Sequence, residues 1–179
     1  CNQTVQKWLG NWFESYVDKN VKLSTKVSYE TIIKKHLVPY IGHIKLKELK
    51  KVDIEDMYEE LLDSGRVDGR GGLSVKTIQN VALVLHRALD EAMKREYIIR
   101  NPADIANVPT LRSEHAAKKE IEVLTQQEQK TLMDVCGDDV YGVGIKTTLF
   151  TGVRLGELLG LKWSDLDYNA KTIRISRQV

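Results

Sequence analysis

The 179-residue sequence predicts a mainly α-helical protein in two parts: a small N-terminal helical bundle, then further helices and a short strand. In four segments of the first hundred residues, apolar residues recur with the 3.6-residue period of an α-helix. Polar and apolar residues alternate at 171–176, as in a half-buried strand. Between 107 and 123, charges of both signs mix and the periodicity weakens. We therefore expect domains at 1–106 and 124–179, joined by a linker at 107–123.

The first two helices are predicted from one apolar stripe and one pair of capping residues. Apolar residues at i, i+3, i+4, i+7 and i+8 spacing predict the first helix: Val5, Trp8, Leu9, Trp12, Phe13, Tyr16 and Val17. The side chains of Trp8, Trp12 and Phe13 are interpreted as packing residues. Ser24 and Thr25 can cap a second helix that runs to about Leu37. Pro39 and Gly42 are expected to end that helix.

A glycine-rich loop separates the third and fourth predicted helices. The third helix is predicted from Ile54, Met57, Tyr58, Leu61 and Leu62. Residues 64–72 lack the Gly-Lys-Ser/Thr ending of a nucleotide-binding P-loop, so we interpret them as a connector. Ser74 can cap a long fourth helix that ends before Asn101-Pro102. Its buried stripe is Val75, Ile78, Ala82, Leu85, Leu89 and Ala92, and its polar face, interrupted by Leu83, is Lys76, Asn80, Arg87 and Lys94.

The second part begins with a capping signal and ends with a strand signal. Thr125 followed by Glu128 is typical of a capping box at a helix start. A second helix is expected at about 139–151, and a strand at Lys171–Ser176.

Composition excludes several classes of protein. No apolar run is long enough for a membrane span, and no secretory signal is visible. Two cysteines, Cys1 and Cys136, argue against a disulfide framework and fit a reducing cytosol. The four histidines lack metal-ligand spacing and are interpreted as surface or capping residues: His36, His43, His86 and His115. We expect no metal and no cofactor.

Charge is distributed unevenly along the chain. Residues 19–51 hold nine lysines and two acids, whereas residues 52–65 hold six acids and no base. Such blocks can be ordinary solvated surface. They can also mark a basic face for a polyanion, with an acidic helix turned away from it.

The segment Thr151–Asp167 contains the candidate catalytic residues. Arg154 follows a glycine and precedes a short apolar helix, and Glu157 lies one turn later within hydrogen-bonding reach. Gly160 and Trp163 are expected to close and anchor the turn. A planar guanidinium can hold two non-bridging phosphate oxygens and stays charged at any working pH. The simpler alternative is a core helix with one surface ion pair.

The whole segment resembles the first conserved box of the tyrosine recombinase (phage integrase) family, T-G-x-R-x-x-E-L-x-x-L-x-W-x-D-[IL]-D. The first hundred residues are similar to the family's core-binding domain at Ser24-Thr25, Tyr29, Leu37, Pro39, Ile41-Gly42, Leu73-Ser74, Thr77, Ala92 and Asn101-Pro102. The resemblance implies a SAM-like four-helix core-binding bundle, followed by the first helices and first strand of the mixed α/β catalytic domain. Integrases of conjugative transposons and temperate phages are the most similar members.

By resemblance, Arg154 is catalytic and Glu157 supports it. The implied activity is site-specific DNA recombination, the integration or excision of a mobile element. A tyrosine attacks a phosphodiester to form a 3′-phosphotyrosine, with no metal and no external energy source. The implied partners are duplex DNA with inverted-repeat core sites, a dimer or tetramer of the protein on that DNA, and an excision accessory protein. The implied location is the bacterial cytoplasm, at the nucleoid.

The sequence departs from the family pattern because it stops at Val179, inside the expected first strand of the small sheet. The family's catalytic lysine, His-x-x-Arg box and nucleophilic tyrosine have no place in it. All seven tyrosines precede the expected site, so none is nominated, and Lys171 is not taken as the catalytic lysine. We expect a fragment that is inactive alone.

Predicted DNA contacts come from the second helix, the fourth helix and the linker. Helix starts present backbone amides to phosphate, and lysines position a protein on the backbone. Asn80 could read an adenine edge. The candidates are Thr25, Lys26, Lys34, Lys35, Ser74, Lys76, Thr77, Asn80, Arg87, Lys118 and Lys119.

Two other functions remain open from the sequence. One is a DNA-binding regulator that uses the same fold and never cuts. The other is a helical protein–protein module, against which the arginine segment and the charge distribution argue.

Overall fold

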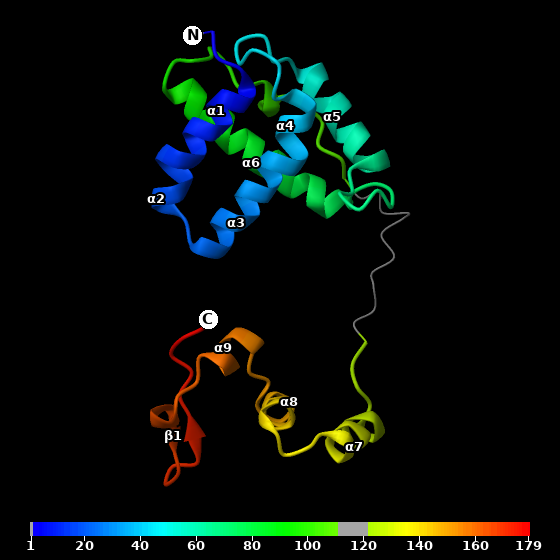
Figure 1. The fold of residues 1–179 in the computed structure, drawn as a ribbon, viewed down its shortest axis with the longest axis vertical. Helices are drawn as coiled ribbons and strands as arrows, with labels where there is room; N and C mark the ends of the chain where they lie inside the picture. Colours follow the sequence, from blue (N-terminus) through cyan, green and yellow to red (C-terminus); the bar gives the residue numbers. More distant parts are fainter. Residues whose placement is uncertain (1, 111–121) are drawn as a thin grey trace. The chain divides into compact units, whose positions relative to one another are not determined.

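The computed structural model describes residues 2–110 and 122–179 (Figure 1). It divides into two units, residues 1–117 and 118–179, each of which is described by itself. The first unit is a helical bundle, as predicted. Within its described residues, 122–179, the second unit has three α-helices, a short 3-10 turn and a two-stranded hairpin. None of the described helices combines the length and apolar content that crossing a bilayer requires.

The first helix of the bundle contains one wide turn. It consists of α1 (Val5–Trp12), the π-helical segment η1 (Phe13–Val17) and α2 (Asp18–Asn20). Trp12 and Val17 are both buried although they are five residues apart. Five residues of a regular α-helix would place them about 140° apart. The i to i+5 bonding of a π turn brings them toward one face.

The second helix, which lies beside the first in Figure 1, also contains a wide turn. It consists of α3 (Leu23–Ile32), the π-helical segment η2 (Ile33–Leu37) and α4 (Val38–Ile41). Its buried hydrophobic residues recur every four positions, at Tyr29, Ile33, Leu37 and Ile41. That spacing drifts by about 40° per step in a regular α-helix. The π segment absorbs part of this drift and keeps the four side chains in the core.

Two details predicted for this helix are wrong. Pro39 does not end it, because the backbone N–H of Val38 bonds to the carbonyl of Ile33, five residues earlier, and the wider turn accommodates the ring of the proline. Gly42 follows the last helical residue, Ile41. Ser24 and Thr25 do not cap the helix, because it begins at Leu23 and Lys22 occupies the extended N-cap position.

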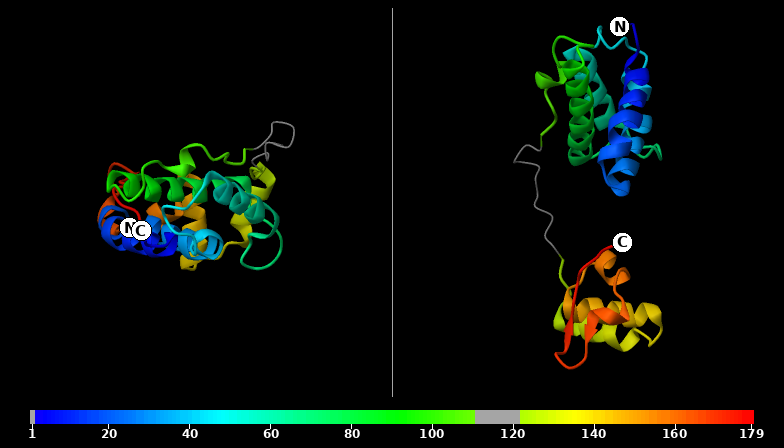
Figure 2. Two further views of the ribbon diagram at one scale, coloured as in Figure 1. Left: turned by 90° about the horizontal axis from the view of Figure 1, so that it is seen from above. Right: turned by 90° about the vertical axis from the view of Figure 1, so that its left-hand side faces the viewer.

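The remaining bundle helices are α5 (Lys51–Ser64) and α6 (Val75–Lys94), followed by the short 3-10 turn η3 (Pro102–Asp104). Ser74 caps α6 as predicted, accepting a hydrogen bond from the backbone N–H of Thr77 at 3.1 Å. α6 lies against α1, α3 and α5 (Figures 1 and 2). Its apolar stripe lies in the core from Ile78 to Ala92. Trp8 donates its indole N–H to the carbonyl of Ala88 at 2.9 Å, so this tryptophan is a packing residue, as expected.

The second unit contains α7 (Gln126–Val135), α8 (Val140–Thr151), α9 (Leu155–Leu159), the 3-10 turn η4 (Trp163–Asp165) and the antiparallel strands β1 (Leu166–Asp167) and β2 (Thr172–Ile173). The capping box of Thr125 and Glu128 is confirmed. The predicted strand 171–176 is shorter, because only Thr172 and Ile173 pair with β1. Lys171 lies in the turn between the strands, with a positive φ of 52°.

Candidate functional site

Arg154 is presented at a sharp turn between two helices. Gly152 ends α8 in the left-handed conformation, with φ of 67°. Residues with a Cβ adopt this conformation only at an energetic cost, so glycine suits the position. Arg154 is the N-cap of α9, and its side chain is 84% exposed. The turn therefore places a guanidinium at the surface, beside a helix start.

Glu157 holds Arg154 by two hydrogen bonds. One carboxylate oxygen accepts the backbone N–H of Arg154 at 2.9 Å, and the other accepts Nη1 of the guanidinium at 3.1 Å. The backbone hydrogen bond, aided by the guanidinium, lowers the pKa of the Glu157 carboxyl, which keeps it ionised. No other hydrogen bond to the guanidinium forms within residues 2–110 and 122–179. Nε and Nη2 are thus available to an anion.

The turn after α9 is anchored differently from the prediction. Gly160 closes α9 as expected, but Trp163 is 83% exposed within the described residues and does not anchor the turn. The buried residue is Asp165, whose side chain is 7% exposed. Arg177 donates two hydrogen bonds to the Asp165 carboxylate and a third, at 3.2 Å, to the carbonyl of Gly160. This pair is not predicted from the sequence, since no local spacing links the two residues.

The predicted polar face of α6 is exposed along its length. Lys76, Asn80, Leu83 and Arg87 all reach solvent. They recur at spacings of four, three and four residues, so they form one stripe on the helix. Ser74 and Thr77 lie at its start, but their hydroxyls bond to each other at 2.8 Å. The cap therefore uses part of their hydrogen-bonding capacity.

The structure brings part of the second helix to this stripe. Arg87 donates a hydrogen bond to the hydroxyl of Tyr29 on α3. Thr25 and Lys26 precede Tyr29 by four and three residues, so they lie on the same side of α3. The name α3–α6 face is used here for the predicted contacts near this hydrogen bond: Thr25, Lys26, Lys76, Asn80 and Arg87. The ammonium group of Lys26 also lies over the ring of Phe13, 6.0 Å from its centroid.

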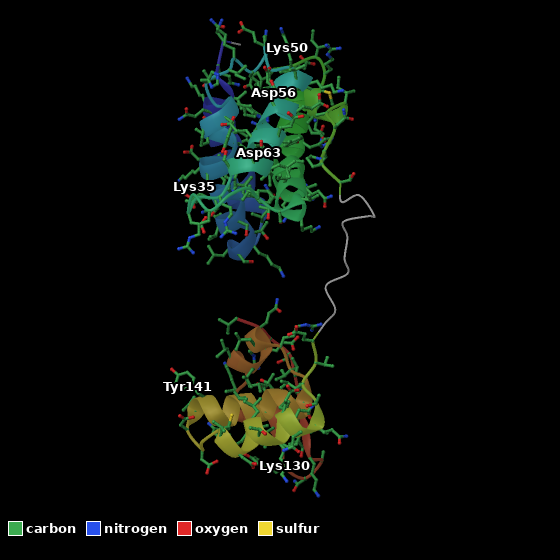
Figure 3. The ribbon with its side chains drawn as sticks, turned by 90° about the vertical axis from the view of Figure 1, so that its right-hand side faces the viewer. Lys35, Lys50, Asp56, Asp63, Lys130 and Tyr141 are labelled. Carbon is green, nitrogen blue, oxygen red and sulfur yellow. The ribbon has the colours of Figure 1, made fainter. Side chains whose placement is uncertain are left out.

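Lys34 and Lys35 are less well placed. Lys34 forms an ion pair with Glu30 at 2.6 Å. Lys35 lies roughly half a helical turn from Lys26, so it projects from another side of the helix. Figure 3 shows Lys35 in the bundle, and shows Asp56 and Asp63 along α5 with Lys50 at the N-terminal end of that helix. Lys118 and Lys119 lie outside the described residues.

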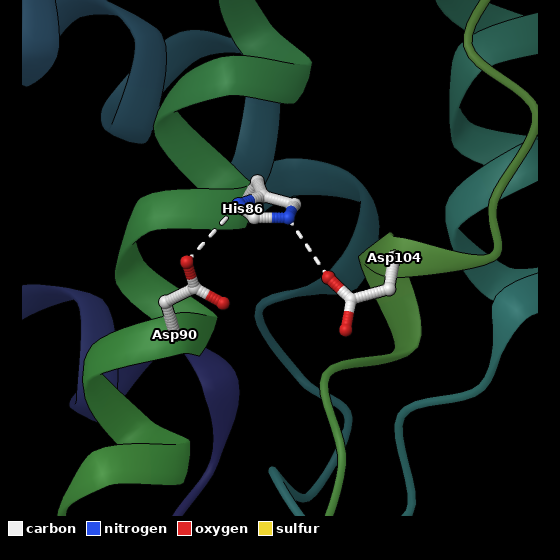
Figure 4. Close-up of side chains that lie close together, drawn as sticks. All are labelled: His86, Asp90 and Asp104. Atoms are coloured by element: carbon white, nitrogen blue, oxygen red, sulfur yellow. Dashed lines mark ion pairs between the residues drawn. The ribbon is translucent and has the colours of Figure 1, made fainter.

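His86 forms a cluster that the sequence did not reveal. Its two ring nitrogens lie 3.3 Å from a carboxylate oxygen of Asp90 and 2.8 Å from one of Asp104 (Figure 4). Asn101 also donates to Asp90 at 2.8 Å. The cluster connects η3 to α6, because one ring nitrogen of His86 faces Asp90 and the other faces Asp104. The spacing of His86 and Asp90 is visible in the sequence, but the approach of Asp104 depends on the fold.

The prediction that His36 is a surface or capping residue is wrong. His36 is 6% exposed, and its Nδ1 atom has no hydrogen-bond partner among the described residues. Burial lowers the pKa of the imidazole, because the charged form loses its hydration. The residue belongs to the core of the bundle.

Three of the tyrosines lie in the core or in a turn. Tyr29 and Tyr58 are buried, and burial raises the pKa of Tyr58 to about 12. Tyr168 lies in the exposed turn between β1 and β2. Within the described parts of the chain, no tyrosine hydroxyl is hydrogen-bonded to Arg154.

Comparison with known proteins identifies the family. Residues 4–62 match the family described as "Phage integrase, N-terminal SAM-like domain". An integrase of Saccharopolyspora erythraea is 31% identical over 176 residues, which cover 97% of this chain and 38% of that protein. The solution structure of a phage integrase SAM-like domain from Moorella thermoacetica is 34% identical, with a TM-score of 0.51, and covers 63% of this chain and 91% of that domain. The chain belongs to the tyrosine recombinase (phage integrase) family.

A further integrase structure is similar beyond the bundle. The Tn1549 transposon integrase in complex with transposon right end DNA is 26% identical, with a TM-score of 0.71, over 98% of this chain and 53% of that chain. The mainly helical fold and the family predicted from the sequence are thus confirmed. The chain spans less than two fifths of the Saccharopolyspora integrase and about half of the Tn1549 chain.

Proposed function

We propose that this chain supplies the DNA-binding bundle and the first catalytic arginine of a site-specific DNA recombinase. The observation that carries the proposal is the arrangement of Arg154 and Glu157. An exposed guanidinium is fixed by a carboxylate at a helix start. The relatives named integrase, and the DNA in the Tn1549 complex, support duplex DNA as the substrate.

The chemistry assigned to Arg154 is stabilisation of a phosphodiester under attack. Charge grows on the non-bridging oxygens as a tyrosine hydroxyl attacks phosphorus and the 5′-oxygen leaves. A guanidinium whose Nε and Nη2 are unoccupied can donate to both oxygens. Because Glu157 holds the group in advance, little reorganisation is needed in the transition state. The product of this step is a 3′-phosphotyrosine, and a free 5′-hydroxyl then attacks it to rejoin the strands.

The α3–α6 face is proposed to grip DNA. Its cations neutralise phosphates, and Asn80 is a candidate for reading a base edge in the major groove. Ser74, Thr77, Lys34 and Lys35 are proposed as additional contacts, and Lys118 and Lys119 as contacts from the linker. In this proposal residues 1–106 are the core-binding domain, 107–123 the linker and 124–179 the first part of the catalytic domain.

The intact recombinase is proposed to act as a dimer or tetramer on inverted-repeat core sites of a mobile element, in the nucleoid of a bacterial cell. An excision accessory protein is proposed to set the direction of the reaction. We expect the 179 residues by themselves to bind duplex DNA without cleaving it.

The test of this function is Arg154→Ala in the full-length protein. Affinity for a core-site duplex should change by no more than a few-fold, because one exposed cation is removed from an extended interface. Single-turnover cleavage should be lost. Cleavage at the wild-type rate would remove Arg154 from the mechanism. A full-length protein that binds the site but never cleaves it, even with Arg154 present, would instead establish a DNA-binding regulator.

A further inference from the structure

We propose that Arg177 is a positioning residue for Arg154, acting through the buried carboxylate of Asp165 and the C-terminal end of α9. This inference rests on the proposed function, because it concerns the placement of the same guanidinium. Glu157 fixes that guanidinium relative to α9. Arg177 fixes α9 itself relative to the hairpin that follows it.

The helix that carries Arg154 needs external support. α9 has five residues, and so short a helix is not stable by itself. Its apolar side chains Leu155 and Leu159 are exposed within the described residues, so they do not anchor it there. The support visible in the structure comes from α8 and from the chain segment 174–179, which runs along α9.

Asp165 accepts most of the hydrogen bonds that hold this segment in place. Its carboxylate accepts the backbone N–H of Lys162 at 2.8 Å and both terminal nitrogens of Arg177. Its own carbonyl accepts the backbone N–H of Arg174 at 2.8 Å. The guanidinium of Arg177 lowers the pKa of the Asp165 carboxyl most, and the Lys162 N–H adds to this. A buried carboxylate with this set of donors stays ionised and holds its partners in one geometry.

Arg177 extends this support to α9. The same Nη1 atom that meets Asp165 also reaches the carbonyl of Gly160, the residue that ends α9. The backbone N–H of Val179 donates to the carbonyl of Gly156, one turn earlier, at 3.0 Å. The segment 174–179 therefore contacts both ends of the short helix. Its contact near the N-terminal end is with Gly156, two residues after Arg154.

Two glycines allow this close approach. A Cβ at Gly156 would lie 3.0 Å from the carbonyl oxygen of Val179. A Cβ at Gly160 would lie 3.1 Å from Cγ of Arg177 and 3.2 Å from its carbonyl oxygen. Larger side chains at either position would push the segment away from α9. The sequence thus leaves room for Arg177 on the surface of the helix that begins at Arg154.

Loss of Arg177 would leave Asp165 buried and unpaired and Gly160 without its side-chain donor. A buried charge that loses its partner drives local rearrangement. Since α9 is short, a small tilt moves its N-cap, and displacement of a catalytic group by about 1 Å can cost on the order of 100-fold in rate. DNA affinity depends on the separate α3–α6 face and should change little.

The experiment compares Arg177→Met and Arg177→Lys in the full-length protein, with Arg174→Met as the matched control. Arg174 is an exposed arginine of the same segment, and only its backbone takes part in the support described above. Binding to a core-site duplex and single-turnover cleavage are measured for each variant. We expect Arg177→Met to cleave about 10 to 100 times more slowly, with affinity within about three-fold. Arg177→Lys should recover part of the rate, and Arg174→Met should match the wild type.

A second substrate separates positioning from general damage to the fold. In this DNA, a methyl group replaces one non-bridging oxygen of the scissile phosphate, which makes the linkage uncharged. The demand for a guanidinium is then smaller. The rate deficit of Arg177→Met should therefore shrink on this linkage, as should that of Arg154→Ala.

Each outcome has one meaning. An equal Arg177→Met deficit on both linkages, or an affinity loss as large as the rate loss, would overturn the positioning role and indicate a merely structural residue. A wild-type rate for Arg177→Met would overturn it as well. If Arg154→Ala itself cleaves normally, the proposed function fails first, and that result is distinct from failure of the Arg177 inference alone.

Discussion

Arg87 on α6 donates a hydrogen bond from its guanidinium to the hydroxyl of Tyr29 on α3. The ring of Tyr29 stacks on Trp12, with 6.0 Å between the ring centroids. One arginine is thus connected to the core through a tyrosine while it contributes to the exposed α3–α6 face. Its structural and DNA-binding roles can be separated by changing one partner at a time.

Tyr29→Phe should reduce stability and leave the electrostatics of DNA binding intact. The change removes one hydrogen bond, so we expect a loss of about 1 kcal/mol in the free energy of unfolding. Arg87→Met removes a cation, and the slope of log affinity against log salt should fall by about 1. Equilibrium binding across a salt series, together with urea denaturation, checks both statements. An unchanged slope for Arg87→Met would mean that Arg87 does not meet phosphate.

Lys76 and Asn80 should differ in what they contribute to binding. Lys76→Ala should weaken binding to all duplexes equally, because phosphate contacts carry no sequence information. Asn80→Ala should reduce discrimination between the preferred and an altered site by about 1 to 3 kcal/mol. Competition binding with a panel of single-base variants measures both effects. Lys47→Ala, in the connection between α4 and α5, is the control, and an equal effect there would show that the α3–α6 face is the wrong surface.

His36 should make the bundle less stable in mild acid. Burial lowers the pKa of this imidazole in the folded protein, so the unfolded chain takes up the proton first as the pH falls. The stability is therefore complete above about pH 6.5, the ordinary value for histidine, and is lost as the pH falls toward the lower pKa of the folded state. His36→Leu should flatten the dependence of unfolding free energy on pH between about 7 and 5. A dependence as steep in His36→Leu as in the wild type would contradict the assignment.

The two units should differ in hydrogen exchange. The bundle buries many large side chains, including Trp8, Trp12 and Tyr58. Within described residues 122–179, Val153 is the one buried hydrophobic side chain. We expect amides in the middle of α6 to exchange at least 100-fold more slowly than those of α8 in the 179-residue chain, because α8 opens without global unfolding. Comparable protection in α8 would show that the second unit is stabilised by contacts of another kind.

The sequence predicts the bundle well because its helices are amphipathic and its capping residues act locally. Ser74 and the apolar stripe of α6 needed no tertiary information, and neither did Thr125 in the second unit. Pro39 was misread because the rule that proline ends a helix assumes a regular α-helix, and the wide turn before it removes that condition. The strand at 171–176 was overestimated because alternation predicts a half-buried strand only where a partner strand exists.

The sequence predicts the contact between Arg154 and Glu157, but it does not predict the residues that hold α9 in place. The spacing of Arg154 and Glu157 places them one turn apart, so their contact follows from the sequence alone. Arg177 and Asp165 are separated by a hairpin, and only the fold brings them together. Trp163 was expected to anchor the turn because it is large and apolar. In the structure the turn is instead anchored by Asp165, whose carboxylate accepts hydrogen bonds from Arg177.

The π segment at Ile33–Leu37 makes the second helix behave as an α-helix with one inserted residue. Deleting a single residue there would restore regular winding and leave Leu37 and Ile41 facing the core, because the wide turn accommodates one residue. Regular winding without such a deletion would instead rotate the downstream residues by about 100°, and Ile41 would leave the core. A gap of one position between this sequence and a relative, if it fell in this segment, would therefore change the winding of one turn and keep the buried face of the bundle in place.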